Sequence, residues 1–419
     1  MIYRILKIWV KAGYSHYFSN IEVVGLENVD REKPAIFAVN HPSAFIEPTL
    51  IATESPFDVH FITRGDVFVK QFRWFFDATN QVPVFRFKDG FSSLRNNKSS
   101  FDKCHEKLMS GAKLLIFCEG SMKWVKRLRP VQQGAAKLAM GTLEKDPELP
   151  LMIHPVGVNY EDHTKAGTDI MLQIGKAIPM AEYFAKYQKS PREVIKGLTH
   201  DLQAALQECI VHIERDEDLL LMDQIWGPLS DVSQVENKKY NGILFSKYKK
   251  AANWINGMNL DKKSELKIKA ADYSKSLSWF NLSDRQLKAL TVFSWWDYLW
   301  LLSLGSILKI VFELNKLPYR LADFISEKKT PNVEFYVSVK AVLTALFYTL
   351  FILFLLVFWS PFWHVLIFVT LAKIAFYTDD RWNAMIKGLF VNKNKLREAG
   401  FRRKDLVQFL KENISDEKA

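Results

Sequence analysis

Residues 40–49, NHPSAFIEPT, contain two side chains that together can move a proton. His41 follows an apolar run, and Glu47 lies six positions later. An imidazole takes up a proton near neutral pH, and a neighbouring carboxylate fixes its tautomer and stabilises the cation. Pro42 suits a first helical turn, so we expect His41 at a strand-to-helix turn. Residues six apart lie roughly 120° apart around a helix, so the two side chains meet only if His41 is outside it.

The segment around His41 and three later blocks together resemble a known family. The first block, with His41 and Glu47, is similar to the first signature of the glycerolipid acyltransferases, the glycerophosphate and lysophosphatidate acyltransferase superfamily. That signature is usually His-x4-Asp and in some branches His-x5-Asp. Residues 82–86 (VPVFR), 116–121 (IFCEGS) and 154–160 (HPVGVNY) resemble the second, third and fourth signatures, in the same order. The resemblance covers roughly residues 20–200.

The resemblance implies a role for each motif residue. His41 would deprotonate an acceptor hydroxyl, and Glu47 would orient the imidazole in place of the usual aspartate. The residues expected to bind the phosphate and glycerol of the acceptor are Arg86, Glu119, Gly120, Ser121 and Arg129. Arg129 belongs to a basic run that follows Met122, which stands where many members have an arginine. Pro155 would lie on the acyl-donor side.

The reaction that the resemblance implies is O-acyl transfer from acyl-CoA or acyl-carrier protein to 1-acylglycerol 3-phosphate (lysophosphatidate). Glycerol 3-phosphate, another lysolipid or an amino-acid lipid are alternative acceptors, and a non-catalytic lipid-binding relative is a further alternative. The acyl thioester is a co-substrate, so we expect no cofactor and no metal. Cys118 closes an apolar run, where a thiol is usually inert, so we do not expect it to be a nucleophile.

Composition limits the remaining possibilities. The 419 residues carry 57 Lys+Arg against 46 Asp+Glu, a net charge of +11, and 48% are hydrophobic, which excludes disorder. The three cysteines form no CxxC pair, so a disulfide framework and a cysteine zinc site are excluded and a reducing compartment is favoured. The positive charge suits a membrane lipid surface, a phosphate-bearing acceptor or an acidic carrier protein. We expect no nucleic-acid partner, because no binding motif accompanies the charge.

An α/β acyltransferase domain is expected over residues 21–200. β-Rich runs alternate there with helical patterns such as 101–109, which predicts a mostly parallel central sheet flanked by helices. The runs are residues 35–40, 59–63, 114–118, 152–159 and 170–174.

The C-terminal part predicts a transmembrane helical hairpin over residues 336–380. Residues 341–358 carry no charge, residues 362–377 are largely apolar, and Ser360-Pro361 separates them. Basic residues precede the pair and dominate the tail, residues 381–419, so the positive-inside rule places both ends in the cytoplasm. We therefore expect an integral protein of a bacterial-type inner membrane, with the catalytic domain on the cytoplasmic side.

Three further segments complete the predicted organisation. Residues 1–20 read as a basic amphipathic interfacial helix. Residues 201–290 read as a polar helical region with a break at Gly227-Pro228. Residues 291–335 are an amphipathic interfacial helix or a third membrane helix, plus a connector, and the Trp cluster near Asp297 favours the interfacial interpretation.

Overall fold

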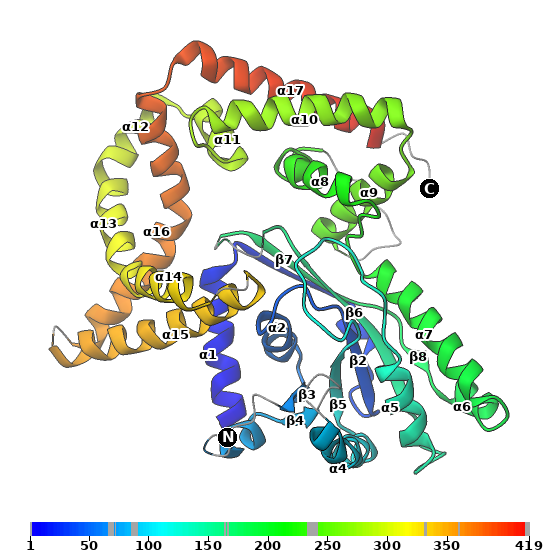
Figure 1. Cartoon of the computed structure of the whole chain (residues 1–419). Helices are drawn as coiled ribbons and strands as arrows, with labels where there is room; N and C mark the ends of the chain where they lie inside the picture. Colours follow the sequence, from blue (N-terminus) through cyan, green and yellow to red (C-terminus); the bar gives the residue numbers. More distant parts are fainter. Residues whose placement is uncertain are drawn as a thin grey trace. The chain divides into compact units, whose positions relative to one another are not determined.

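The computed structural model describes residues 2–65, 71, 73–84, 91–162, 165, 167–232, 242–330, 333–358 and 361–414. The chain forms two compact units (Figure 1). The first comprises Met1–His212 and Asn237–Phe245, and the second comprises Ile213–Glu236 and Ser246–Ala419.

The first unit is built on a mostly parallel sheet, as predicted. Its strands follow the order β1-β7-β6-β2-β5-β3-β4, with β8 paired to β6. The pairs β6–β7 and β6–β8 are antiparallel, and the others are parallel. The strands are β1 (Asn20–Val24), β2 (Ala35–Val39), β3 (Val59–Arg64), β4 (Gln81–Val84), β5 (Lys113–Phe117), β6 (Met152–Tyr160), β7 (Asp169–Ile174) and β8 (Ile178–Pro179).

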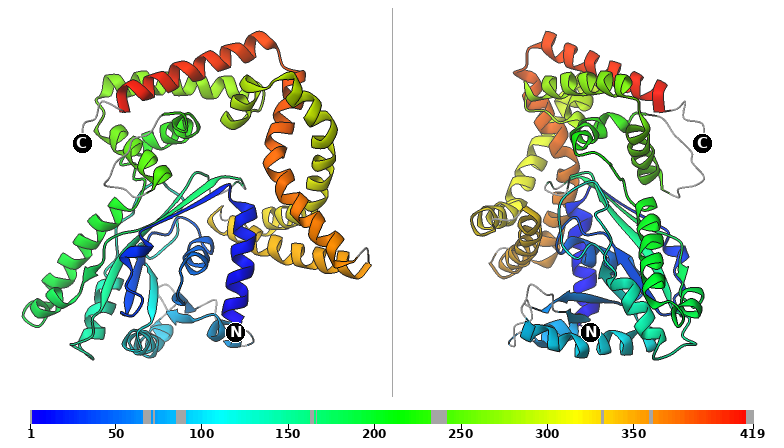
Figure 2. Two further views of the ribbon diagram at one scale, coloured as in Figure 1. Left: turned by 180° about the vertical axis from the view of Figure 1, so that it is seen from behind. Right: turned by 45° about the vertical axis from the view of Figure 1, so that its right-hand side comes forward.

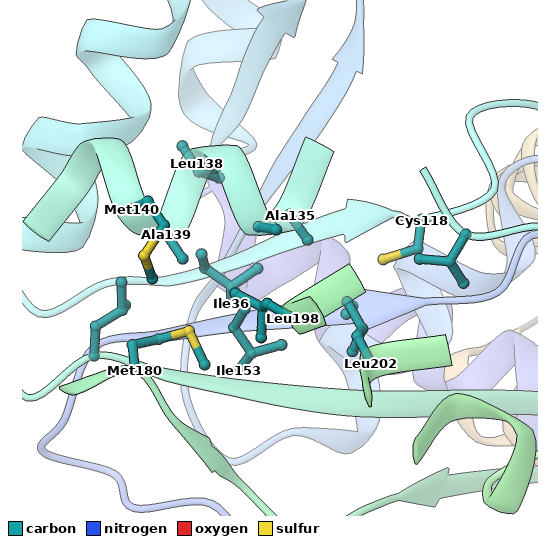
Figure 3. Packing of buried hydrophobic residues seen from close by; sticks show 14 of the residues in the cluster. Ile36, Cys118, Ala135, Leu138, Ala139, Met140, Ile153, Met180, Leu198 and Leu202 are labelled. Carbon is teal, nitrogen blue, oxygen red and sulfur yellow. The ribbon is translucent and has the colours of Figure 1, made fainter. Parts of the chain in front are cut away.

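Helices cover both faces of this sheet (Figure 2). They are α1 (Ile2–Tyr17), α2 (Ile46–Glu54), α3 (Arg73–Ala78), α4 (Phe91–Met109), α5 (Gly134–Leu143), α6 (Ala181–Tyr187) and α7 (Pro191–Glu208). On one face, Ile36 and Ile153 of the sheet pack with Leu138 of α5 and Leu198 of α7 in the main core (Figure 3). Side chains alternate along a strand, so Phe37 points to the opposite face, where it stacks on Phe57.

The second unit is helical throughout its described residues. Its helices are α8 (Asp216–Leu229), α9 (Ile243–Gly257, which begins in the first unit), α10 (Leu260–Ser278), α11 (Asp284–Val292), α12 (Trp295–Trp300), α13 (Ser306–Asn315), α14 (Leu317–Lys329), α15 (Val333–Phe358), α16 (Phe362–Leu389) and α17 (Lys393–Ile414), with a π-helical segment at Leu301–Gly305. Helix α8 continues through Pro228 and ends at Leu229, slightly beyond the predicted break.

One of the two predicted membrane spans has the length and composition of a membrane helix. Among the described residues, one helical stretch is long and apolar enough to cross a membrane. This stretch, Val339–Phe358 in α15, has a mean hydropathy of 2.7, and only 6% of it is buried. The apolar part of α16 is limited to Phe362–Ala372, which is shorter than the ~17 residues that a span needs. Lys373 interrupts the apolar run, and the second span stays a prediction.

Candidate active site

His41 lies in the turn between β2 and α2, outside the helix as predicted. Strand β2 ends at Val39, and α2 begins at Ile46. Buried Asn40 fixes the start of the turn, because its side-chain amide donates to the Val158 carbonyl (3.0 Å) and its carbonyl accepts from the Val158 N–H (2.8 Å). The expectation that Pro42 opens the helix is wrong, since the helix begins four residues later.

The structure brings the His41 and Glu47 side chains together. His41 Nδ1 lies 3.3 Å from Glu47 Oε2, and the His41 ring stacks on Phe117 with centroids 3.7 Å apart. The Glu47 side chain is fully buried, whereas that of His41 is 12% exposed. Because Nδ1 faces the carboxylate, Nε2 is the ring nitrogen left to accept a proton from a substrate.

Two further donors hold the other oxygen of Glu47. Oε1 accepts hydrogen bonds from the backbone N–H of Ser43 (2.7 Å) and from the hydroxyl of Tyr160 (2.9 Å). Burial, together with the charge of Glu47, raises the pKa of Tyr160 well above its usual value, so the phenol stays protonated and donates. Sequence reasoning assigned no role to Tyr160, although it ends the fourth block and closes β6.

The third block forms a loop that is tied to His41 through Glu119. Glu119 Oε2 accepts from the His41 backbone N–H (3.2 Å) and from Arg129 Nη2 (2.7 Å), and Oε1 accepts from the Arg129 N–H (3.0 Å). Arg129 Nη1 also donates to Ser121 Oγ (2.7 Å). In this arrangement Arg129 organises the loop, and binding a phosphate would require it to exchange some of these bonds.

Gly120 makes the turn of this loop possible. Its φ of +70° lies in the left-handed region, and a Cβ there would come within 3.3 Å of Gln132 Cγ. Gln132 itself donates its backbone N–H to the Cys118 carbonyl (2.7 Å). Burial and the nearby Glu119 charge raise the pKa of the Cys118 thiol to about 12, so it stays protonated and is a poor nucleophile.

Two predicted site residues remain, Arg86 and Pro155. Arg86 falls outside the described residues. Pro155 pairs with Ala38 within the sheet, where its ring packs so closely on Gly175 that a Cβ on that glycine would lie 2.7 Å from Pro155 Cγ. The structure thus collects His41, Glu47, Glu119, Gly120, Ser121 and Arg129 at one edge of the sheet.

Parallel topology explains why these segments meet. The turn of His41 follows β2, the loop of Glu119 follows β5, and Tyr160 ends β6, and both β5 and β6 run parallel to β2. The carboxyl ends of all three strands therefore lie at the same edge, which is where open α/β sheets bind ligands.

Comparison with known proteins agrees with this geometry. Residues 20–159 match the family model described as Acyltransferase. This part of the chain is similar to an acyltransferase domain. The chain is 25% identical over 217 residues to "Glycerol-3-phosphate O-acyltransferase 2" of Saccharomyces cerevisiae, a match that covers 49% of this chain and 27% of the yeast protein. It is 30% identical over 141 residues to the chloroplastic 1-acyl-sn-glycerol-3-phosphate acyltransferase LPAT1 of Arabidopsis thaliana, which covers 33% and 37%.

The matches thus span less than two fifths of these relatives' own lengths. Among solved structures, the 1-acyl-sn-glycerophosphate acyltransferase PlsC of Thermotoga maritima aligns with a TM-score of 0.36 and 16% identity, over 48% of this chain and 79% of that one.

Proposed function

We propose that the chain is a membrane-bound O-acyltransferase that moves a fatty acyl group from acyl-CoA or acyl-carrier protein to 1-acylglycerol 3-phosphate. The observation that carries the proposal is the His41–Glu47 pair, held at the ligand-binding edge of the sheet within the acyltransferase domain. A buried carboxylate beside an imidazole is the arrangement that a general base requires.

The mechanism uses this pair directly. His41 Nε2 takes the proton from the acceptor hydroxyl as the oxygen attacks the thioester carbonyl. Glu47 stabilises the resulting imidazolium through Nδ1, from 3.3 Å away. When the tetrahedral intermediate collapses, the C–S bond breaks, and the departing thiolate recovers the proton from His41. The step needs no acyl-enzyme, which agrees with the protonated thiol of Cys118.

The N-terminal helix supports a membrane-inserted acceptor. Helix α1 lies along α2, the helix of Glu47, because Lys7 Nζ donates to the Ser55 carbonyl (2.6 Å) and Lys11 pairs with Glu54 (2.9 Å). Elsewhere on α1, Ile5 and Ile8 are 58% and 71% exposed. An exposed apolar face beside basic residues is typical of a helix that lies in the membrane interface. Lysophosphatidate, which carries an acyl chain, would reach the site from that interface.

Glycerol 3-phosphate is the second candidate acceptor. The yeast relative that matches over 217 residues is named for that substrate, and the His-x5 spacing of this chain resembles branches that acylate it. A water-soluble acceptor would not need the exposed face of α1, which is why we place it second.

The acceptor can be decided with the purified full chain in detergent. Lysophosphatidate and glycerol 3-phosphate are offered in parallel, each with acyl-CoA and with acyl-carrier protein. We expect faster product formation with lysophosphatidate. Faster acylation of glycerol 3-phosphate would overturn the choice of acceptor, and no product with either would contradict the proposed activity.

The proposal also places the catalytic domain on the cytoplasmic side of a bacterial-type inner membrane. The basic residues of α17, which include Arg402, Arg403 and Lys404, favour that side by the positive-inside rule. A reporter fused after Ala419 should therefore report the cytoplasm, and an external signal would contradict this topology.

A further inference from the structure

The helices α12–α16 of the second unit carry an unusually apolar exterior. Exposed residues include Trp296 (67%), Ile307 (59%) and Ile310 (63%) before α14, and Phe324 (54%) on α14. In α15, only 6% of the apolar stretch Val339–Phe358 is buried. These residues are spread over every helix of the group rather than gathered in one patch, so a single protein partner of ordinary size would leave many of them in water.

The same helices place charged and polar groups between them. Helix α13 packs along α16, and α14 packs along α15 (Figures 1 and 2). Lys309 of α13 pairs with Asp379 of α16, and both side chains are largely buried. Lys340 of α15, with a side chain 4% exposed, pairs at 3.1 Å with Asp323 of α14, whose side chain is 40% exposed. Buried lysines that pair with carboxylates beneath an exposed apolar surface are typical of a protein whose solvent is lipid, because ionisable groups there turn inward and pair with one another.

The chain before and after this bundle returns to one side of it. Helix α10 precedes the bundle and α17 follows it, and the two helices lie side by side (Figure 1). Lys269 of α10 pairs with Asp405 of α17 at 2.7 Å, and Arg402 of α17 donates to the Asp272 carbonyl of α10 at 3.0 Å. Both helices are rich in charge, so the same aqueous compartment must hold them.

The apolar part of α16 is too short for a full return crossing. Phe362–Ala372 rises about 16 Å, close to one leaflet and about half of a ~30 Å hydrocarbon core. A complete crossing by α15 would require α16 to carry Lys373 and Asp379 back through the core. A shallow insertion avoids this cost, because charged side chains are expensive at the bilayer centre.

We propose that α12–α16 form a monotopic bundle that inserts into one leaflet, entering and leaving on the side of α10 and α17. Lipid covers the apolar exterior of this bundle. This insertion involves the second unit alone and is independent of the proposed reaction, so it can be tested without an assay of acyl transfer.

The lipid contact can be tested with variants of the full chain that each carry one added cysteine. Each variant is labelled with a fluorophore and reconstituted into phosphatidylethanolamine and phosphatidylglycerol vesicles. The three native cysteines are buried, which limits background labelling. Labels at Ile310→Cys and Phe324→Cys should lose quenching by iodide and be quenched by nitroxide-labelled lipid. Ile268→Cys on α10 is a matched control, because Ile268 is 64% exposed against 63% for Ile310, and it should show the reverse. Protection of Ile310→Cys from both quenchers would reveal a protein partner and overturn the proposal, as would iodide quenching equal to that of the control.

A second variant separates shallow insertion from a spanning hairpin. Phe358 ends α15 and is 74% exposed. A membrane-impermeant maleimide should fail to label Phe358→Cys from either side of the vesicle, while it labels Ile268→Cys from one side. Labelling of Phe358→Cys from the side opposite to Ile268→Cys would show that the hairpin crosses the bilayer and would overturn the monotopic insertion.

Discussion

At the scale of single residues, the longer side chain of Glu47 matches its longer spacing from His41. The helix of Glu47 begins at Ile46, so its carboxylate must reach back across the turn to Nδ1 and to the Ser43 N–H. The extra methylene of glutamate, compared with aspartate, supplies this reach. The pair has the chemistry of the glycerolipid acyltransferase signature, even though its spacing differs from the commonest form.

Tyr160 is a positioning residue for this pair, and its removal should slow turnover. In Tyr160→Phe, Glu47 loses a buried donor, and hydrogen bonds to charged groups contribute about 1.5–3 kcal/mol. We expect kcat to fall about tenfold or more with little change in the KM for the acceptor, because Glu47 is set back from the substrate. Steady-state kinetics measure both constants. Tyr183→Phe is the matched control, since Tyr183 donates to Asp201 in an exposed position. Equal kcat values for Tyr160→Phe and the unaltered chain would show that Tyr160 does not position the His41–Glu47 pair.

At the scale of helices and strands, the sequence predicted the central sheet better than its margins. The runs that correspond to β2, β5, β6 and β7 are largely buried, so their apolar character is nearly continuous. The strands β1, β4 and β8 were not predicted, because β1 lies at an edge, β4 contains Pro83 and β8 has two residues.

The same limits apply to the site. Six predicted residues meet there because their motifs follow parallel strands, which local patterns can indicate. The contact between Tyr160 and Glu47 joins residues 113 positions apart, and no short motif records such a contact. The start of α2 was misjudged because the Ser43 N–H bonds to the Glu47 side chain, and the turn continues to Phe45.

His60 of strand β3 should make the stability of the sheet decrease in acid. Burial, with a contribution from Lys107, lowers the pKa of His60 to about 4. The unfolded chain therefore binds this proton first, so the stability that depends on neutral His60 is complete above pH ~6.5 and is lost as the pH falls toward 4.

Thermal unfolding from pH 8 to pH 4 should show a smaller decrease in midpoint for His60→Gln than for the unaltered chain. His200→Gln, at an exposed histidine, is the control and should leave the profile unchanged. Burial also lowers the pKa values of His105 and His154, so part of the decrease should persist. Identical profiles for His60→Gln and the unaltered chain would exclude His60 as a cause.

At the scale of the whole molecule, the last helix of the described chain closes the second unit. Arg403 of α17 binds both carboxylate oxygens of Asp284 on α11, at 2.8 and 3.0 Å, and also Asp231 at 2.6 Å. The Tyr273 hydroxyl of α10 donates to the same Asp284. This cluster joins segments that lie before and after the apolar helices, so the proposed membrane bundle and the polar helices depend on one another.

Arg403→Met should therefore destabilise the second unit far more than a neighbouring change. It leaves two partly buried carboxylates without their guanidinium partner, which costs about 3 kcal/mol. Arg402→Met is the matched control, because its ion pair with Glu398 and its hydrogen bond to the Asp272 carbonyl are more exposed, and such contacts contribute about 1 kcal/mol or less each. Denaturant unfolding of both variants in detergent gives the comparison. Equal stabilities would show that the Arg403 cluster does not hold α17 in place.

Acyl transfer by His41→Ala tests the general-base role of His41 most directly. The assay uses the full chain with lysophosphatidate and acyl-CoA, and His200→Ala serves as the control at an exposed histidine. If His41 is the general base, turnover should fall at least about 100-fold in His41→Ala, while the control keeps its rate. A rate for His41→Ala close to that of the control would contradict the account of the site.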